Sequence, residues 1–245
     1  AQIESVQFNN NGGIIQVDSG TLGIVGSGDK TFNGGSYIVS AGTILDLDII
    51  IVSGFITGTV QGELQWGSSI VVPESATFDF DGNGEINWLS GFLTGGGVLT
   101  NAGTINLVGT SGVSIANATA LNNAGILNIG GTIFNDISIT GDSQLINLTD
   151  GFIDFQADCI LISGTSGTIT NSGLIRRTSS TGESGLSFVN LDNTGGTIQV
   201  ESGTFSFTQG NPKSFTGGTI NVFSGATFDI DSPSPLSGTI DGQVD

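Results

Sequence analysis

Short stretches of this chain alternate apolar and polar residues one by one, and glycine, asparagine or serine separates the stretches. In the segment Gly196-Thr-Ile-Gln-Val200, Ile198 and Val200 point to one side of the chain, and Thr197 and Gln199 point to the other. A two-residue period is typical of a β-strand with one buried face. The pattern therefore predicts an all-β protein built of short strands that tight turns connect.

The alternating stretches recur at a spacing close to 22 residues. The phrase Asn101-Ala-Gly-Thr-Ile-Asn-Leu107 returns as Asn123-Ala-Gly-Ile-Leu-Asn-Ile129. Hairpin meanders would instead show turn signals about every 8 to 12 residues. Each repeat is better explained as one coil of a solenoid, with three short strands and three turns, on which the next coil stacks in parallel at about 4.8 Å.

The spacing predicts one domain, residues 1–245, because dividing 245 residues by 22 gives about eleven coils of 22–24 residues. A second similarity also favours a linear array of coils. Residues 8–47 align without gaps on residues 191–230, at an offset of 183, with 16 of 40 positions identical. The identical positions include the pair Lys30 and Lys213.

Turn residues and outward residues are expected to form columns along the solenoid. Asparagine and glycine adopt the left-handed backbone conformation that sharp corners need, and stacked asparagine amides can hydrogen-bond from coil to coil. The expected corner column consists of Asn101, Asn123, Asn171 and Asn193. An outward column is expected from Thr104, Thr197, Thr219 and Thr239, with Asn106, Asn128, Gln199 and Asn221 beside it. A flat threonine array is one way to bind ice or glycans, but threonine is also favourable on any outward strand face.

The phrase Asn-x-Gly-x-Ile-x-Val, followed by Ser-Gly-x-Thr-Phe as in Ser224 to Phe228, resembles the repeats of a known family type. It is similar to bacterial surface adhesins, filamentous-haemagglutinin-like proteins and autotransporter passengers. The resemblance implies a single-stranded right-handed parallel β-helix. It also implies an exported stalk, adhesin or fibre whose specificity lies in local insertions.

The net charge of the chain excludes some classes of binding partner. The formal net charge is -18, because 22 acidic residues face only 4 basic ones. Nucleic acids and anionic membranes are therefore disfavoured. The apolar runs Ile49–Val52 and Cys159–Ile162 are far shorter than the roughly 20 residues of a membrane span, so we expect no membrane insertion. The first residues, Ala1 and Gln2, are compatible with a mature end left by signal cleavage, which favours a secreted, extracellular or cell-surface protein.

The strongest metal motif is Asp79-Phe-Asp81-Gly-Asn83-Gly-Glu85-Ile86, which matches the first eight positions of a calcium loop. Position twelve is Ser90, where that loop carries a bidentate glutamate. The alternative is that the motif is two ordinary pieces of coil, since the apolar-Asp-apolar-Asp phrase recurs elsewhere. Calcium at Asp79, Asp81, Asn83 and Glu85 is thus the candidate cofactor, and no other cofactor is expected.

The only two tryptophans, Trp66 and Trp88, are 22 residues apart and should stack on neighbouring coils. Stacked indoles can form a platform that binds a sugar ring. They share the strand parity of Leu64 and Ile86, however, which favours a buried aromatic stack.

Two smaller motifs have alternative interpretations. Arg176-Arg177 is a basic pair in an acidic chain, and we expect an internal salt link or a solvated surface, with an anion or partner contact as the alternative. Asn117-Ala-Thr119 and Asn147-Leu-Thr149 are acceptor sequences for N-glycosylation, relevant if the source modifies them.

Enzymatic function is disfavoured by what the composition lacks. Without histidine there is no Ser-His-Asp or Cys-His nucleophile and no His-ligated zinc, and one cysteine cannot close an internal disulfide. We therefore expect a non-catalytic structural or adhesive solenoid of a bacterial cell surface, which associates with itself end to end or continues into further repeats. A carbohydrate-binding or carboxylate-based carbohydrate-cleaving protein is the alternative, and ice binding is less favoured.

Overall fold

The computed structural model describes residues 1–81, 85–109, 112–130, 137–162, 166–179, 181–208, 211–215, 217–230 and 236–238. The regular structure of these residues consists of 31 β-strands, β1 to β31. Within them, no helix is long and apolar enough to cross a membrane.

The strands form the three faces of a prism, and the chain visits face A, face B and face C in turn. Face A is an 11-stranded sheet. Its strands are β1 (Gln2–Glu4), β4 (Thr21–Val25), β6 (Ile44–Leu47), β8 (Glu63–Trp66), β11 (Glu85–Trp88), β14 (Thr104–Leu107), β17 (Ile126–Ile129), β20 (Phe152–Phe155), β23 (Leu174–Arg177), β26 (Thr197–Val200) and β29 (Thr219–Val222).

The remaining 20 strands make up faces B and C, which are joined because β5 (Lys30–Val39) and β7 (Ile50–Val60) bend from one face onto the other. Face B also contains β2 (Phe8–Asn11), β9 (Ile70–Val71), β12 (Gly91–Thr94), β15 (Val113–Ile115), β18 (Ile137–Ile139), β21 (Ile160–Ile162), β24 (Glu183–Ser187), β27 (Thr204–Thr208) and β30 (Thr227–Asp229). Face C also contains β3 (Ile14–Val17), β10 (Ser75–Asp81), β13 (Val98–Asn101), β16 (Ala120–Asn123), β19 (Gln144–Asn147), β22 (Thr168–Asn171), β25 (Asn190–Asp192), β28 (Lys213–Phe215) and β31 (Leu236–Gly238).

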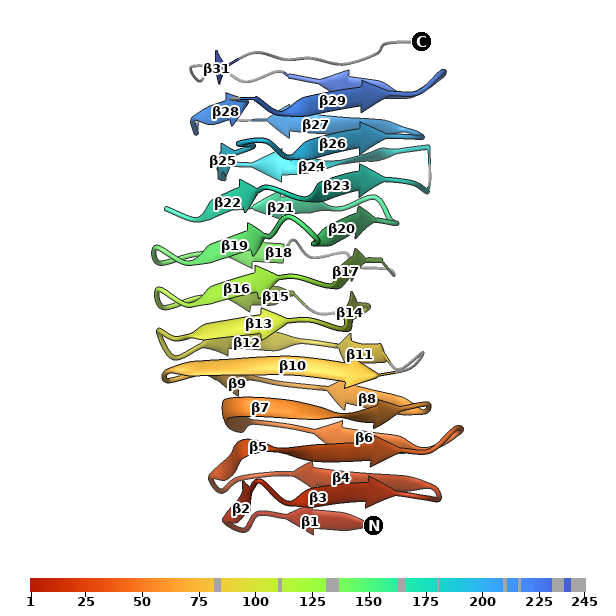
Figure 1. Ribbon diagram of the computed structural model, residues 1–245, viewed down its shortest axis with the longest axis vertical. Helices are drawn as coiled ribbons and strands as arrows, with labels where there is room; N and C mark the ends of the chain where they lie inside the picture. Colours follow the sequence, from red (N-terminus) through yellow and green to blue (C-terminus); the bar gives the residue numbers. More distant parts are fainter. Residues whose placement is uncertain are drawn as a thin grey trace.

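Strands of the same face pair in parallel with the strand of the next coil, which confirms the predicted β-solenoid. In Figure 1 the nearer strands run to the right and the more distant strands run to the left while the chain ascends, so the coil is right-handed. Face A records 11 passes of the chain. The solenoid has about nine turns, a small difference from the eleven coils that the sequence predicts.

The core fills the inside of the prism as one continuous cluster of buried apolar side chains. On β26, Ile198 and Val200 are buried and Thr197 and Gln199 are half-buried, as the alternation predicts. Full burial of one such aliphatic side chain contributes about 1.5–3 kcal/mol relative to leaving it exposed. Because each coil covers the apolar layer of the previous one, the parallel stack is the arrangement that removes these residues from water.

The similarity between residues 8–47 and 191–230 has an unexpected geometry. Residues 14–17 form β3 on face C, while their counterparts 197–200 form β26 on face A. The offset of 183 residues divided by 22 is 8.3, which is eight turns and one third of a turn. The two segments are therefore rotated by one face, because a strand-and-turn phrase fits any of three similar faces.

Both lysines of that similarity are buried, Lys30 at 1% exposure and Lys213 at 0%. The Lys213 ammonium donates hydrogen bonds to the carbonyls of Val189 and Asn211, both at 2.8 Å. The Lys30 ammonium donates to the carbonyls of Gly26 and Gly28 in the same way. Each lysine thus replaces an apolar side chain at a corner and ties that corner to nearby backbone.

Burial lowers the pKa of Lys213 from 10.5 to about 8. Between pH 8 and 10.5 the unfolded chain therefore binds more protons than the folded one, so the free energy of unfolding should rise with pH. We expect a rise of about 1 kcal/mol from pH 8 to 9.5, measured from urea unfolding monitored by circular dichroism. Burial raises the pKa of Tyr37 to about 12, so above pH 10 this group lowers the free energy of unfolding as the pH rises. The measurement therefore stops below pH 10.

The variant Lys213→Met is the control for this pH dependence, because it keeps the length of the side chain and removes the titrating amine. Its stability should lack the rise between pH 8 and 9.5. An identical rise in Lys213→Met would show that another group causes it.

Candidate functional site

An interior void between the apolar side chains of the solenoid is too small for a ligand. Phe32, Tyr37, Trp66 and neighbouring apolar residues line a void of about 20 Å³. This is about the volume that one water-sized probe occupies. Candidate binding functions therefore belong to the exterior surface.

The exterior of face A carries two columns of side chains, one from each outward position of its strands. The first column contains Thr104, Thr197 and Thr219, as predicted. It is not a continuous threonine array, because Ile126, Phe152 and Leu174 occupy the three strands between Thr104 and Thr197. Thr239, the fourth predicted member, lies outside the described residues.

The second column of face A includes Asn87, Asn106 and Asn128, which hydrogen bonds connect to one another and to Glu63 and Gln156 beside the column. The hydrogen bonds connect Asn87 to Glu63 (2.7 Å), Asn106 to Asn87 (3.1 Å), Asn128 to Asn106 (2.8 Å) and Gln156 to Asn128 (3.2 Å), each named donor first. The predicted neighbours Gln199 and Asn221 continue the same column. These amides satisfy one another, so this part of the surface is rigid and polar.

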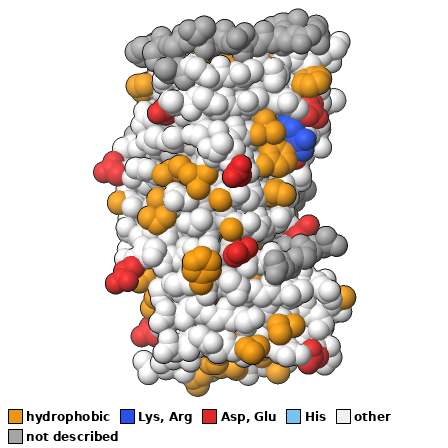
Figure 2. Space-filling view, viewed as in Figure 1, with side chains coloured by type: hydrophobic (Ala, Val, Ile, Leu, Met, Phe, Trp, Pro, Cys, Tyr) orange, Lys and Arg blue, Asp and Glu red, His pale blue; other side chains and the backbone are white. Residues whose placement is uncertain are grey.

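Arg176 interrupts this row and contacts three side chains. Its guanidinium donates to Asp154 at 3.0 Å, lies 3.8 Å from Glu201 and stacks 4.4 Å from the ring centroid of Phe152. This confirms the expected salt link. The other three basic residues are at most 1% exposed, whereas the side chain of Arg176 is 30% exposed. Figure 2 shows one face of the molecule, on which basic atoms appear at the upper right beside apolar and acidic side chains.

Arg177, the other half of the basic pair, points inward and is 0% exposed. It donates to the carbonyl of Ala157 at 3.0 Å and pairs with the carboxylate of Asp158. The parity of its strand, in which Ile175 also points inward, is the signal that places it there. A solvated surface position is therefore wrong for Arg177.

A groove of about 480 Å³ opens where the corner between faces C and A meets β20, β23 and β26. Its lining residues are Thr149, Asp150, Gly151, Phe152, Ser172, Gly173, Leu174, Gly195, Thr197 and Gln199. The corner beside it is enlarged: Asn147 and Gly151 are four residues apart, whereas Asn123 and Gly125 are two apart. Leu148, Thr149 and Asp150 are exposed as a result.

The groove was not among the sites that the sequence predicts. Two signals would have pointed to it, namely the longer interval after Asn147 and the apolar residues Phe152 and Leu174 at outward positions. Both are departures from the repeat, and such departures identify sites in a repeat protein better than the repeated residues do.

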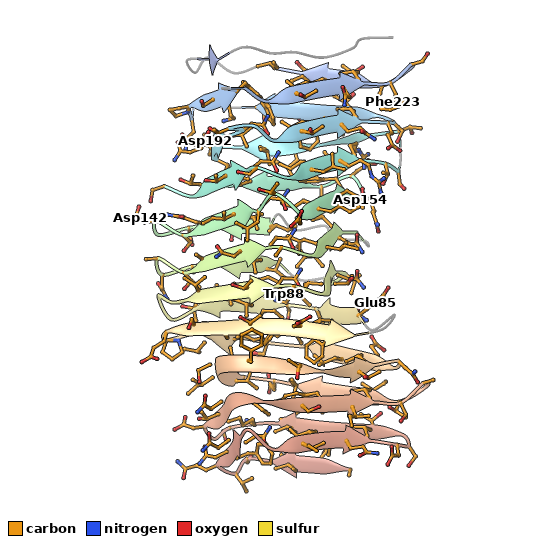
Figure 3. The ribbon with its side chains drawn as sticks, in the orientation of Figure 1. Glu85, Trp88, Asp142, Asp154, Asp192 and Phe223 are labelled. Atoms are coloured by element: carbon orange, nitrogen blue, oxygen red, sulfur yellow. The ribbon has the colours of Figure 1, made fainter. Side chains whose placement is uncertain are left out.

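The calcium motif lies where the chain leaves β10 and enters β11. Asp79 on β10 and Glu85 on β11 are both exposed, and Figure 3 shows Glu85 at the edge of the ribbon. Asn83 and the side chain of Asp81 lie outside what the structure describes. The described residues contain no group of three or more metal-ligating His, Cys, Asp or Glu side chains. Calcium binding there remains a prediction.

The two tryptophans form a buried stack, as strand parity indicates. Trp66 and Trp88 are each 1% exposed, and their rings are parallel within 4° with centroids 4.3 Å apart. Figure 3 shows Trp88 among the side chains of the central coils. A sugar-binding platform needs a solvent-exposed ring face, which neither indole has, so the glycan platform at Trp66 and Trp88 is not supported by their positions.

Five asparagines form a buried column, here called the asparagine ladder, along the corner between faces C and A. Its members are Asn101, Asn123, Asn147, Asn171 and Asn193, each at most 1% exposed. Each side-chain amide donates to the next carbonyl oxygen, at 2.8, 2.8, 2.8 and 2.6 Å. The four predicted members are confirmed, and the structure adds Asn147.

Of the two predicted N-glycosylation sequences, the one at Asn147 is buried. The amide of Asn147 is 0% exposed in the asparagine ladder, so it is not accessible as an acceptor in the folded chain. Asn117 is exposed at another corner, where its amide donates to Thr94 at 2.7 Å. Only Asn117 of the two is placed as a surface acceptor.

Among carboxyl groups, Asp46 has a raised pKa, caused first by burial and second by the negative charge of Asp48. A general acid in a carboxylate-based glycosidase needs such a shift. The groove described above does not include Asp46, however. The two features therefore do not form one site.

Comparisons of the chain with protein-family models, with curated proteins and with solved structures found no match. The parallel β-solenoid fold is established by the structure alone.

Proposed function

We propose that the protein is a non-catalytic structural or adhesive β-solenoid, a stalk or fibre segment exposed outside a bacterial cell. The continuity of the stack carries this proposal. The asparagine ladder, the apolar core and the three strand faces run from coil to coil with one shared axis, which suits a rigid spacer. The adhesin-like repeat phrases point to the same class of protein.

End-to-end association follows from the edges of the faces. In this chain β1 pairs with β4 on one side only, so its other edge presents free backbone donors and acceptors. The first-pass residues Ile3 and Phe8 pack against the core but are only partly buried. Unpaired strands and exposed apolar residues favour the addition of another strand layer. We propose that a second copy or further coils of a longer protein cover this edge.

Catalysis is the less favoured alternative. It requires charged groups converging on a cleft, and the groove on face A contains one carboxylate, that of Asp150, among its described lining. A carbohydrate-cleaving enzyme would bring at least two carboxyl groups to the scissile bond. The groove fits binding better than cleavage.

Size-exclusion chromatography with negative-stain electron microscopy tests the structural proposal. We expect the purified chain to form elongated species that grow with protein concentration, because each end covers the exposed layer of the next copy. Adding charge in the end layer, as in Ile3→Lys, should shift the population toward monomers. A monomer that persists at high concentration without fibres would contradict self-association, while leaving a role as part of a longer stalk.

A further inference from the structure

We propose that the groove on face A is a binding site for a neutral glycan chain that lies along the solenoid axis. The inference does not depend on end-to-end association, since the groove lies on the side of the prism. It assigns a ligand class to the adhesive part of the proposed function.

The groove forms where the sequence and the corner length differ from the regular repeat. Phe152 and Leu174 stand one above the other on neighbouring strands and give it an apolar floor. The enlarged corner at Thr149 and Asp150 forms one wall, and Thr197 and Gln199 lie at the end on the next coil. Its volume of about 480 Å³ lies within the range of about 300–1,000 Å³ of small-ligand sites.

Glycine leaves one side of the groove without a side chain at Gly195. A Cβ atom added there would meet no other atom within 4 Å, so this side of the groove is open. The φ angle of Gly195 is 75°, a left-handed conformation that glycine adopts without strain.

The aromatic residue of the groove is held in place before any ligand arrives. The guanidinium of Arg176 covers one side of Phe152, and the carboxylates of Asp154 and Glu201 fix that guanidinium. Fixed side chains lose little conformational entropy on binding, which raises affinity. Phe152 offers the groove the part of its ring that Arg176 leaves free.

The chemistry of the lining favours a neutral polyhydroxylated ligand. The C–H surface of a sugar packs on Phe152 and Leu174, while its hydroxyl groups donate to Asp150 and exchange hydrogen bonds with the amide of Gln199. None of the lining residues is basic, and Arg176 beside Phe152 is already paired with the carboxylates of Asp154 and Glu201. Because the chain also carries a net charge of -18, acidic glycans are repelled.

Two further observations favour a glycan over a peptide strand. β20, β23 and β26 are each paired on both sides, so no free strand edge is present for an added peptide strand. The groove crosses three coils, which stack at about 4.8 Å. One sugar ring of an extended glycan spans about the same distance as one coil.

A glycan array printed with neutral, amino and acidic oligosaccharides, followed by calorimetry on the full chain, tests this proposal. We expect binding of at least one neutral oligosaccharide and none of the acidic ones. Phe152→Leu, which removes the ring, and Asp150→Asn, which removes the acceptor charge on an exposed corner, should each weaken that binding at least tenfold. Asp150→Asn changes no buried contact, so its result does not depend on folding.

Matched controls are present elsewhere on the surface. Phe92 is 53% exposed on face B and Asp142 is exposed at another corner, so Phe92→Leu and Asp142→Asn repeat the same changes away from the groove. Both should bind within twofold of the unchanged protein. The proposal is overturned if no neutral glycan binds at millimolar concentration, if acidic glycans bind instead, or if the groove variants bind as well as their controls.

Discussion

Replacing Asn147 by alanine is expected to lower the free energy of unfolding by about 3–5 kcal/mol, because it opens the asparagine ladder at its centre. The Asn147 amide donates to Asn171 at 2.8 Å and to the carbonyls of Gly151 and Leu174 at 3.1 Å, and its oxygen accepts from Asn123 at 2.8 Å. Alanine removes a partner from each of these buried groups, although the Gly151 carbonyl still accepts from Leu174 N–H and the Asn123 amide still donates to the Phe152 carbonyl. A buried group that is left without a partner costs about 1–3 kcal/mol. Urea unfolding followed by circular dichroism measures the change.

Asn128 supplies the matched control, because it belongs to the hydrogen-bonded row on the outside of face A. Its amide donates to Asn106 at 2.8 Å and its oxygen accepts from Gln156 at 3.2 Å, but water can replace both partners. Asn128→Ala should cost about 1 kcal/mol. Equal losses in the two variants would show that the buried ladder contributes no more than the surface row.

Much of the fold could be predicted from the sequence, because each coil must bury one face of its short strands and turn sharply between them. The alternation of apolar and polar residues assigned the strands, and the 22-residue period assigned the parallel stack. Asn101 and Asn123 could be assigned to corners because each is followed by one alanine and then by a glycine. Asn147 escaped this pattern, since two extra residues separate it from Gly151.

Other features depend on geometry that the period does not contain. The three faces have similar sequence patterns, so a repeated sequence phrase does not indicate the face on which its strand lies. Residues 8–47 and 191–230 match in sequence but lie one face apart. Columns also depend on the local length of each coil: Leu64 pairs with Ile86, 22 residues later, whereas Ile86 pairs with Ile105, only 19 residues later. Such changes decide which outward residues meet.

The candidate site was the least predictable part. Sequence motifs drew attention to Trp66, Trp88 and the acidic loop beginning at Asp79, which are all elements of the repeat. The groove instead arises from an enlarged corner and from Phe152 and Leu174 on neighbouring strands. Its residues are ordinary by themselves, and only the register of β20 and β23 brings them together.

Replacing Trp88 by alanine is the second change with a large expected effect, about 3–5 kcal/mol of lost stability. The indole is 1% exposed, stacks on Trp66 with ring centroids 4.3 Å apart and donates a hydrogen bond to the carbonyl of Ser90 at 2.9 Å. Alanine removes the stack and the hydrogen bond and leaves a cavity that flanking coils cannot close, because each is fixed by its own strand pairs. The midpoint of urea unfolding should fall with an unchanged denaturant slope.

Two variants separate the causes of this loss. Trp88→Phe keeps an aromatic ring but removes the indole N–H, so it should cost about 1–2 kcal/mol. Phe92→Ala removes an aromatic ring that is 53% exposed on face B, and its cost should stay below about 1 kcal/mol. If Trp88→Ala is no more destabilising than Phe92→Ala, the indole stack does not stabilise the core, and a role for these rings at a surface would have to be reconsidered.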